Sequence, residues 1–182
     1  MLFAYHHQPF AYFQRFDPTT SKGRADRRIH LRDAQDLDID IRSGQLPPVT
    51  FFKPADVRSE HPGLGSVAAG DAVIGRVREM LDGSPMRNSY ALIITYDEFG
   101  GFFDHVPAPV GSSTAGRADF FGPGTRIPAV LVSPLVNAGT INSTEFETTS
   151  IAKMIAERFD LDPLPSPRFS AVKGLAEAFT DR

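Results

Sequence analysis

The sequence predicts an α/β domain in three layers, with a mostly parallel sheet packed between helices. Three short apolar runs, 46–52, 90–96 and 127–133, have the length and composition of strands. Between the first two runs lies a segment, 67–81, whose apolar residues recur at helical spacing. A strand, a helix and a strand in this order form a βαβ unit, which requires parallel strands and a crossover connection.

Length and composition are those of one globular domain, 1–182, that binds no nucleic acid through a basic surface. The chain has 182 residues, is 41% hydrophobic and carries a net charge of −3. It has no cysteine, which excludes disulfides and thiolate metal sites. No apolar run reaches the ~18 residues of a membrane span. The first residues lack the basic start and apolar centre of a signal peptide, and the compartment is left open.

The N-terminal part is predicted to be an aromatic arm, 1–18, followed by a polar and mostly basic loop, 19–28. The aromatic residues of the arm are Phe3, Tyr5, Phe10, Tyr12, Phe13 and Phe16. Aromatic side chains at this density need a surface to bury against. We expect that surface to belong to sequence upstream of this chain.

Further elements follow from periodicity and from turn residues. Residues 30–42 predict a short surface helix or an irregular turn, closed by Ser43-Gly44. The helix over 67–81 begins at Ser66 or Asp71 and ends at Gly83.

Beyond the third strand the sequence predicts a second helix. Residues 110–126 read as a long loop, and the helix runs from 151 to 159 after the capping hydroxyls of 148–150. The proline-rich segment 163–167 closes the domain, and 170–182 forms a short terminal helix.

The candidate site follows the run 90–96, which we expect to be a strand buried on both faces. Asp97 and Glu98 come directly after it, and Asp104 and His105 follow two glycines. The simpler interpretation is a strand followed by a polar turn. Three acids and a histidine within nine positions favour a site, because open α/β sheets bind ligands at the carboxyl ends of strands.

The chemistry of these groups suits a divalent cation and a phosphoryl group. Asp97 and Glu98 offer oxygen ligands for Ca²⁺, Mg²⁺, Mn²⁺ or Zn²⁺, and both reach one ion only if the strand has ended before Asp97. His61 and His105 can bind a phosphoryl oxygen, ligate the metal or move a proton. Lys53 and Arg126 can attract an anionic substrate, although a surface charge is the simpler interpretation of each. The sequence has no Gly-x-Ser-x-Gly motif, so a serine hydrolase triad is unsupported. It has no glycine-rich phosphate loop, so nucleotide binding of that kind is unsupported as well.

Several motifs in sequence order resemble the bacterial phosphoesterase family of phospholipases C and acid phosphatases, within the alkaline-phosphatase superfamily. The motifs are Thr-Tyr-Asp-Glu-Phe-Gly-Gly-Phe-Phe-Asp-His-Val-Pro (95–107), Gly-Pro-Gly-Thr-Arg-Ile-Pro-Ala-Val-Leu-Val-Ser-Pro (122–134), Thr-Thr-Ser-Ile (148–151), and the shorter strings 46–54 and 60–63. The resemblance runs from about Ala11 to Arg168. It implies an alkaline-phosphatase-like fold, here truncated on its N-terminal side.

The resemblance also implies roles for the candidate residues. Asp97 and Glu98 correspond to the acidic pair that supports the metal, and His61 to the histidine at the phosphoryl group. Asp104 and His105 match the motif that closes the wall of the site. In the superfamily a Ser or Thr hydroxyl attacks phosphorus and the metal neutralises charge on the transferred group. We therefore expect His61 and Asp97, 36 positions apart (97 − 61), to approach each other.

Two parts of the family's site have no match here, because the chain resembles the C-terminal half. No Glu-Asn dipeptide occurs, and no hydroxyl nucleophile is identified. The Thr-Thr-Ser form of 148–150 favours the acid phosphatase branch, hence metal-dependent hydrolysis of phosphate monoesters. The alternatives are phospholipase C activity on phosphodiester headgroups, and an inactive fragment with a binding role. Expected partners are a phosphate ester and either a missing N-terminal half or a second copy; the family is commonly exported.

Overall fold

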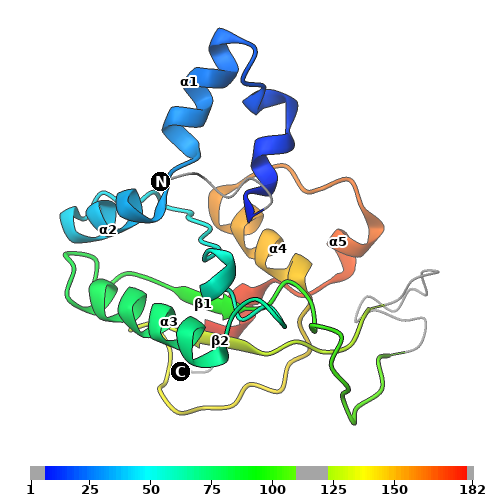
Figure 1. Cartoon of the computed structure of the whole chain (residues 1–182). Helices are drawn as coiled ribbons and strands as arrows, with labels where there is room; N and C mark the ends of the chain where they lie inside the picture. Colours follow the sequence, from blue (N-terminus) through cyan, green and yellow to red (C-terminus); the bar gives the residue numbers. More distant parts are fainter. Residues whose placement is uncertain (1–6, 110–122, 180–182) are drawn as a thin grey trace. The chain divides into compact units, whose positions relative to one another are not determined.

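The computed structural model describes residues 7–109 and 123–179, which fall into two compact units, Met1–Asn88 and Ser89–Arg182 (Figure 1). The first unit holds the 3₁₀ turns η2 (Pro9–Tyr12), η3 (Gln14–Phe16) and η4 (Asp56–Arg58) and the helices α1 (Ser21–His30), α2 (Ala34–Ser43) and α3 (Val67–Asp82). The second unit holds the strands β1 (Leu92–Thr95) and β2 (Ala129–Val132), the helices α4 (Thr148–Phe159) and α5 (Pro167–Ala171), and the 3₁₀ turn η5 (Leu175–Phe179).

The helix predicted over 67–81 is confirmed as α3. Ser66 caps it, because its side chain accepts a hydrogen bond from the backbone N–H of Ala69 at 3.2 Å, and Gly83 ends it. The helix reading of 30–42 is confirmed as α2. Asp33 accepts from the backbone N–H of Gln35 at 2.8 Å, and Gly44 closes the helix in the left-handed conformation.

The predicted basic loop 19–28 is wrong, since most of it is α1. The side chain of Thr20 caps this helix by accepting from the backbone N–H of Gly23 at 2.9 Å. Its buried residues are Gly23 and Asp26 rather than aliphatic side chains, so no apolar stripe marks the helix in the sequence. Asp26 instead accepts hydrogen bonds from Arg15 and Lys22.

The aromatic arm finds part of its partner surface inside the first unit. The ring of Phe10 lies 5.7 Å from the ring of Phe13 and 5.7 Å from that of Phe51. Phe16 is buried, whereas Tyr12 is exposed. Phe3 and Tyr5 lie outside the described residues.

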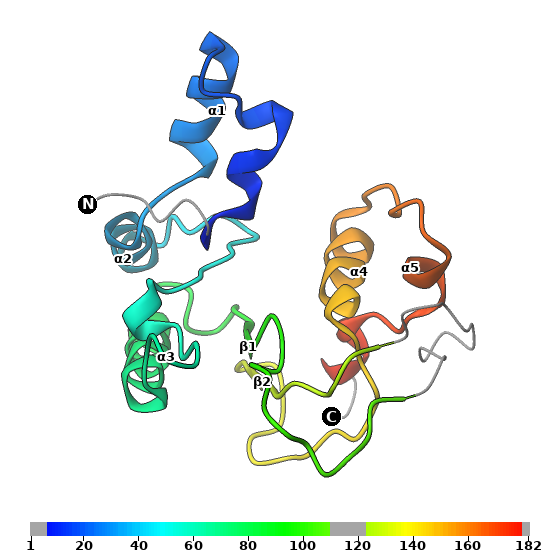
Figure 2. The same cartoon turned by 45° about the vertical axis from the view of Figure 1, so that its right-hand side comes forward.

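The helical core of the first unit forms where α2 packs against α3, which lie side by side in both views (Figures 1 and 2). Ile41 on α2 and Met80 and Leu81 on α3 are buried. An ion pair between Asp38 and Arg76 joins the same two helices. The contact therefore combines a small apolar core with a charged rim.

The predicted parallel three-layer sheet is not seen in the described residues. Their one sheet has two strands, β1 and β2, which pair antiparallel with Leu92 opposite Val132 and Thr95 opposite Ala129. The run 46–52 is not a strand, so the βαβ prediction is wrong. Pro47 and Pro48 carry no N–H for a ladder. Both strands are partly exposed, so the prediction of a strand buried on both faces is wrong. Residues 110–122 of the predicted loop 110–126 lie outside the described residues.

The core of the second unit lies between α4, α5 and η5 (Figures 1 and 2). Phe169, Val172 and Leu175 are buried there. The predicted helix 151–159 is confirmed, and begins three residues earlier. Ser150 is not its N-cap but lies within the first turn, where its buried hydroxyl accepts from the backbone N–H of Glu147 at 2.9 Å. The predicted terminal helix is only in part right: α5 and η5 cover its region, and 180–182 lie outside the described residues.

Candidate functional site

The acidic pair stands directly beyond the end of β1. The strand ends at Thr95, so Asp97 and Glu98 lie outside the alternating pattern of a strand. The two carboxylates can bind one metal ion only under this condition. Both residues are exposed. An oxygen of Glu98 accepts from the backbone N–H of Gly100 at 2.7 Å, and Gly100 and Gly101 have φ angles of 71° and 74°. Glycine is suited to this left-handed turn, which leads the chain back toward Asp104.

Antiparallel pairing brings the segment after β1 beside the segment before β2. The hydroxyl of Thr95 donates to the carbonyl oxygen of Pro128 at 2.9 Å. Further along, Nε of Arg126 donates to Oδ2 of Asp104 at 2.7 Å, although 22 positions separate the two residues. The ion pair thus joins the two segments that border the candidate site.

Asp104 is held as a carboxylate. The hydrogen bond from Arg126 is the largest cause that lowers the pKa of Asp104 below its ordinary value, followed by a hydrogen bond from the backbone N–H of Val106 at 2.9 Å. Nδ1 of His105 lies 3.7 Å from Oδ1 of Asp104, the oxygen that accepts from Val106. Asp104 is therefore an acceptor and a negative charge at neutral pH, not a proton donor.

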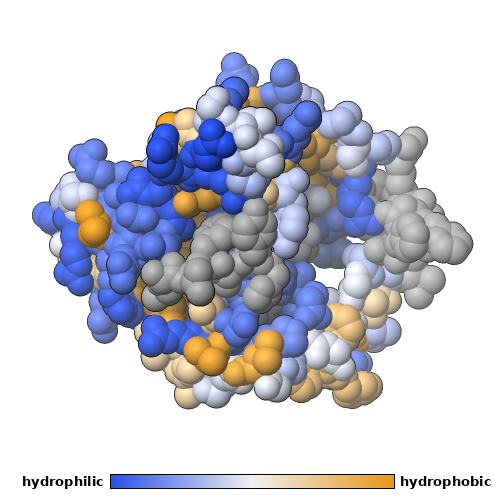
Figure 3. All heavy atoms as spheres, turned by 45° about the horizontal axis from the view of Figure 1, so that its top comes forward, coloured by the Kyte–Doolittle hydropathy of each residue, from blue (hydrophilic) through white to orange (hydrophobic). Residues whose placement is uncertain are grey.

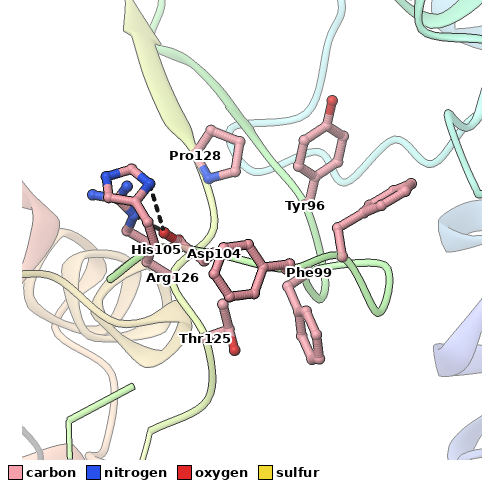
Figure 4. A pocket seen from close by; sticks show the side chains of 9 residues that line it. Tyr96, Phe99, Asp104, His105, Thr125, Arg126 and Pro128 are labelled. Atoms are coloured by element: carbon pink, nitrogen blue, oxygen red, sulfur yellow. Dashed lines mark hydrogen bonds and ion pairs between the residues drawn. The ribbon is translucent and has the colours of Figure 1, made fainter. Parts of the chain in front are cut away.

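These groups border an open pocket of about 280 Å³ (Figure 4). Its lining residues are Tyr96, Phe99, Phe102, Phe103, Asp104, His105, Thr125, Arg126 and Pro128. The side chain of His105 is 82% exposed and that of Arg126 is 59% exposed. A ligand entering the pocket can therefore reach both groups from solvent.

His61 belongs to the first unit and lies on the loop between η4 and α3. It is exposed, and its Nδ1 lies 2.9 Å from the carbonyl oxygen of Pro62. Glu60 next to it has a φ of 62°, and its side chain packs where a Cβ on Gly70 of α3 would stand. The relative position of the two units is not determined, so the approach of His61 to Asp97 stays a prediction.

The acidic pair has the donor chemistry of a divalent-metal site, but the described residues alone do not complete one. Within 7–109 and 123–179, no group of three or more histidine and acidic side chains converges to hold an ion. Asp104, the nearest other acid in the sequence, is engaged by Arg126. The described residues therefore supply part of a metal shell.

Two features of the pocket were missed or undervalued by sequence reasoning. The sequence alone favours a surface charge for Arg126, whereas in the structure its guanidinium holds Asp104. This contact can be inferred only when β1 and β2 are known to pair antiparallel, because that register places the segment that holds Arg126 beside the segment that holds Asp104. The aromatic residues after Tyr96 were visible in the sequence, and no signal there indicated that they line a pocket with charged groups.

Comparison with known proteins now defines the relationship. Residues 2–162 match the Phosphoesterase family. The chain belongs to the Phosphoesterase family. Similar members include phospholipase C A of Mycobacterium tuberculosis, 31% identical over 148 residues and 72% of this chain. They also include non-specific phospholipase C6 of Arabidopsis thaliana, 33% identical over 179 residues and 82% of this chain, and a non-hemolytic phospholipase C of Pseudomonas aeruginosa, 31% identical over 170 residues and 79% of this chain.

The family match confirms the resemblance and refines what it implied. The chain spans 28%, 34% and 25% of the length of these three relatives. All three are phospholipases C by name, so the comparisons favour that alternative over the acid phosphatase reading. Family membership implies the family's fold, of which the described residues show helices and a two-stranded sheet. In the part of the chain that the structure describes, no helix is long and apolar enough to cross a membrane.

Proposed function

We propose that this chain carries part of the site of a phosphoric ester hydrolase of the phospholipase C type, which cleaves the phosphodiester bond of a phospholipid headgroup. The observation that carries the proposal is 31–33% identity to phospholipases C of bacteria and a plant over 148 to 179 residues. The imidazole of His105 and the guanidinium of Arg126 at the pocket of the second unit support it, because such groups bind and polarise a phosphoryl group.

Asp97 and Glu98 are proposed as oxygen ligands of a divalent cation, Ca²⁺, Mg²⁺, Mn²⁺ or Zn²⁺, with the remaining ligands outside the described residues. Such an ion supplies charge neutralisation at the phosphoryl oxygens. Both carboxylates are exposed and lie past the end of a strand, where no alternation forces them apart. The backbone turn at Gly100 fixes the approach of Glu98 through its hydrogen bond.

The pocket residues are proposed to bind and orient the ester. Asp104, kept ionised by Arg126, fixes the wall of the pocket. His105 presents an exposed imidazole beside it, suited to a hydrogen bond to a phosphoryl oxygen or to a proton transfer. His61 is proposed to serve at the phosphoryl group as well, as the resemblance implies.

The covalent step is not assigned to a residue of this chain. The resemblance implies a Ser or Thr nucleophile. The motifs that carry the resemblance belong to the C-terminal half of the family's sequence, and they identify no such nucleophile. A role in binding alone is therefore one outcome of the test below.

The test compares two chromogenic esters, p-nitrophenylphosphorylcholine as the diester and p-nitrophenyl phosphate as the monoester. The purified chain is assayed with each of the four divalent cations, and so are Asp97→Asn and Asp162→Asn. Asp162 is an exposed acid of the second unit that does not line the pocket, so its variant is the matched control. We expect diester turnover to exceed monoester turnover and to fall about a hundredfold or more in Asp97→Asn only.

Each other result has a definite meaning. Faster monoester turnover would favour the acid phosphatase reading. Diester turnover that Asp97→Asn leaves unchanged would remove Asp97 from the site. No turnover of either ester with any cation would contradict hydrolysis by this chain and favour the binding role.

A further inference from the structure

The aromatic side chains of the pocket have no part in the chemistry proposed above. Tyr96, Phe99, Phe102 and Phe103 come from eight consecutive positions, and all four are exposed; Phe102 is 68% and Phe103 is 93% exposed. Rings held in water forgo the stabilisation that burial would give them. Four of them on one short segment make an apolar surface that a ligand could cover.

The charged side of the same pocket offers one guanidinium edge. Arg126 uses Nε for Asp104, and neither of its two Nη nitrogens makes a hydrogen bond to a described residue. Figure 4 shows Asp104, His105 and Arg126 together on one side, and Tyr96 and Phe99 on the other. The two Nη groups of an arginine bind phosphate in a bidentate manner, with planar geometry.

We propose that this pocket binds a phosphate ester that carries an apolar group, with the phosphate on the Nη edge of Arg126 and the apolar group on the aromatic side chains. The inference rests on the proposed function and deepens it, because a phospholipid is such an ester. Both carboxylate oxygens of Asp104 already accept hydrogen bonds, from Val106 and Arg126. Asp104 is thus engaged within the wall of the pocket, and the Nη edge of Arg126 is the part of the ion pair that faces an anion next to the aromatic side chains.

The experiment is a calorimetric titration of the full chain with inorganic phosphate, hexyl phosphate and decyl phosphate, each ester below its critical micelle concentration. We expect affinity to rise from inorganic phosphate to hexyl and then to decyl phosphate, because each buried methylene adds to the hydrophobic contribution. Arg126→Gln should weaken decyl phosphate binding by about tenfold. The double variant Phe102→Ser with Phe103→Ser should weaken decyl phosphate binding by about tenfold and flatten the dependence on chain length.

Two matched variants control for charge and for exposed apolar surface. Arg158→Gln removes an exposed arginine of the second unit that does not line the pocket. Ile141→Ser removes a side chain as exposed as Phe103, at 93%. Neither should change the affinity for decyl phosphate. The phenylalanine variants alter exposed positions, so they test the pocket even if Arg126→Gln perturbs folding.

Three results would overturn the inference. One is equal affinity for inorganic and decyl phosphate. Another is decyl phosphate binding that survives both the Arg126 and the phenylalanine variants. The third is binding to anionic phospholipid vesicles with none to monomeric decyl phosphate, since the chain would then recognise a lipid surface rather than one molecule.

This test and that of the proposed function can fail separately. Amphiphile binding that depends on Arg126, with no turnover of any ester, would uphold the pocket and contradict the hydrolase. Diester turnover whose KM is unchanged in Arg126→Gln and in the phenylalanine variants would uphold the hydrolase and contradict the pocket.

Discussion

At the scale of single residues, the ion pair between Asp104 and Arg126 organises the candidate site. It joins the loop after β1 to the segment before β2, and it is the largest cause of the lowered pKa of Asp104. A carboxyl group whose pKa is lower in the folded chain than in the unfolded chain stabilises the fold at neutral pH. That contribution is lost as the pH falls through the folded-state pKa.

Arg126→Gln should therefore raise the pKa of Asp104 toward its ordinary value. The Asp104 carboxyl carbon, followed by NMR during an acid titration, measures this directly. The variant should also lower the urea midpoint at pH 7 and have little effect in acid below the folded-state pKa. An unchanged Asp104 titration in Arg126→Gln would show that the guanidinium does not set the charge of this wall.

A second residue-scale contact links the His61 loop to α3. A Cβ at Gly70 would overlap Cγ and Oε1 of Glu60, and Glu60 itself has a positive φ. Gly70→Ala should lower the free energy of unfolding by ~1–3 kcal/mol in the wild-type background. In a Glu60→Gly background the same change should raise it by up to ~1 kcal/mol, since alanine is the better helix former.

Urea unfolding of the four proteins in this double-mutant cycle measures the coupling. A Gly70→Ala effect of the same sign in both backgrounds would contradict the contact. The control is Gly75→Ala, also on α3, where a Cβ would meet open space. It should be neutral or stabilising in either background.

At the scale of elements, sequence patterns predicted the helices with apolar faces and failed on the others. The helix α3 carries aliphatic residues at helical spacing, so its end at Gly83 is predicted, and its Ser66 cap is one of the two starts that the sequence offers. The helix α1 buries Gly23 and Asp26, and its stability comes from the contact with η3, which no local pattern encodes. Strand direction failed for a similar reason, because pairing partners lie outside the strand itself.

The start of α4 gives the prediction at this scale. Ser150 is fully buried and accepts from the backbone N–H of Glu147, while Arg168 from α5 donates to the Glu147 carboxylate at 2.7 Å. Ser150→Ala leaves that N–H without its acceptor and should lower the free energy of unfolding by ~1–3 kcal/mol. Thr148→Ala, at an exposed position of the same turn, should cost much less in the same urea titration.

An equal cost for Ser150→Ala and Thr148→Ala would contradict this account of the helix start. The resemblance had singled out 148–150 for its sequence, and a physical role for Ser150 in packing α4 explains that residue type without any part in catalysis.

At the scale of the whole molecule, the described residues bury few large apolar side chains. Eight hydrophobic residues of the described ranges are buried, whereas twenty-one large hydrophobic residues there are exposed. Figure 3 shows orange hydrophobic surface between blue areas on the face that it presents. Exposed apolar area of this extent is typical of surfaces that contact partners. It agrees with the expected association with further sequence or with a second copy, which stays a prediction.

Membership of the Phosphoesterase family could be predicted from sequence, because long motifs such as 95–107 are recognised by their residues alone and need no knowledge of the local conformation. The parallel three-layer sheet is not seen in the described residues, which show only β1 and β2 as strands and pair them antiparallel. The site residues stay a prediction: Asp104 and His105 line one pocket, while His61 and Asp97 belong to different units. The partner of Asp104 was not predicted, since it required the register of the sheet.

The measurement that tests the central proposal most directly is ³¹P NMR of phosphatidylcholine in mixed micelles, incubated with the chain and each divalent cation in turn. A phospholipase C releases phosphocholine, whose resonance is distinct from those of the lipid and of inorganic phosphate. We predict a phosphocholine signal with the wild-type chain and Asp162→Asn, and none with Asp97→Asn. Phosphatidic acid as the product, or phosphocholine release that persists in Asp97→Asn, would contradict the account.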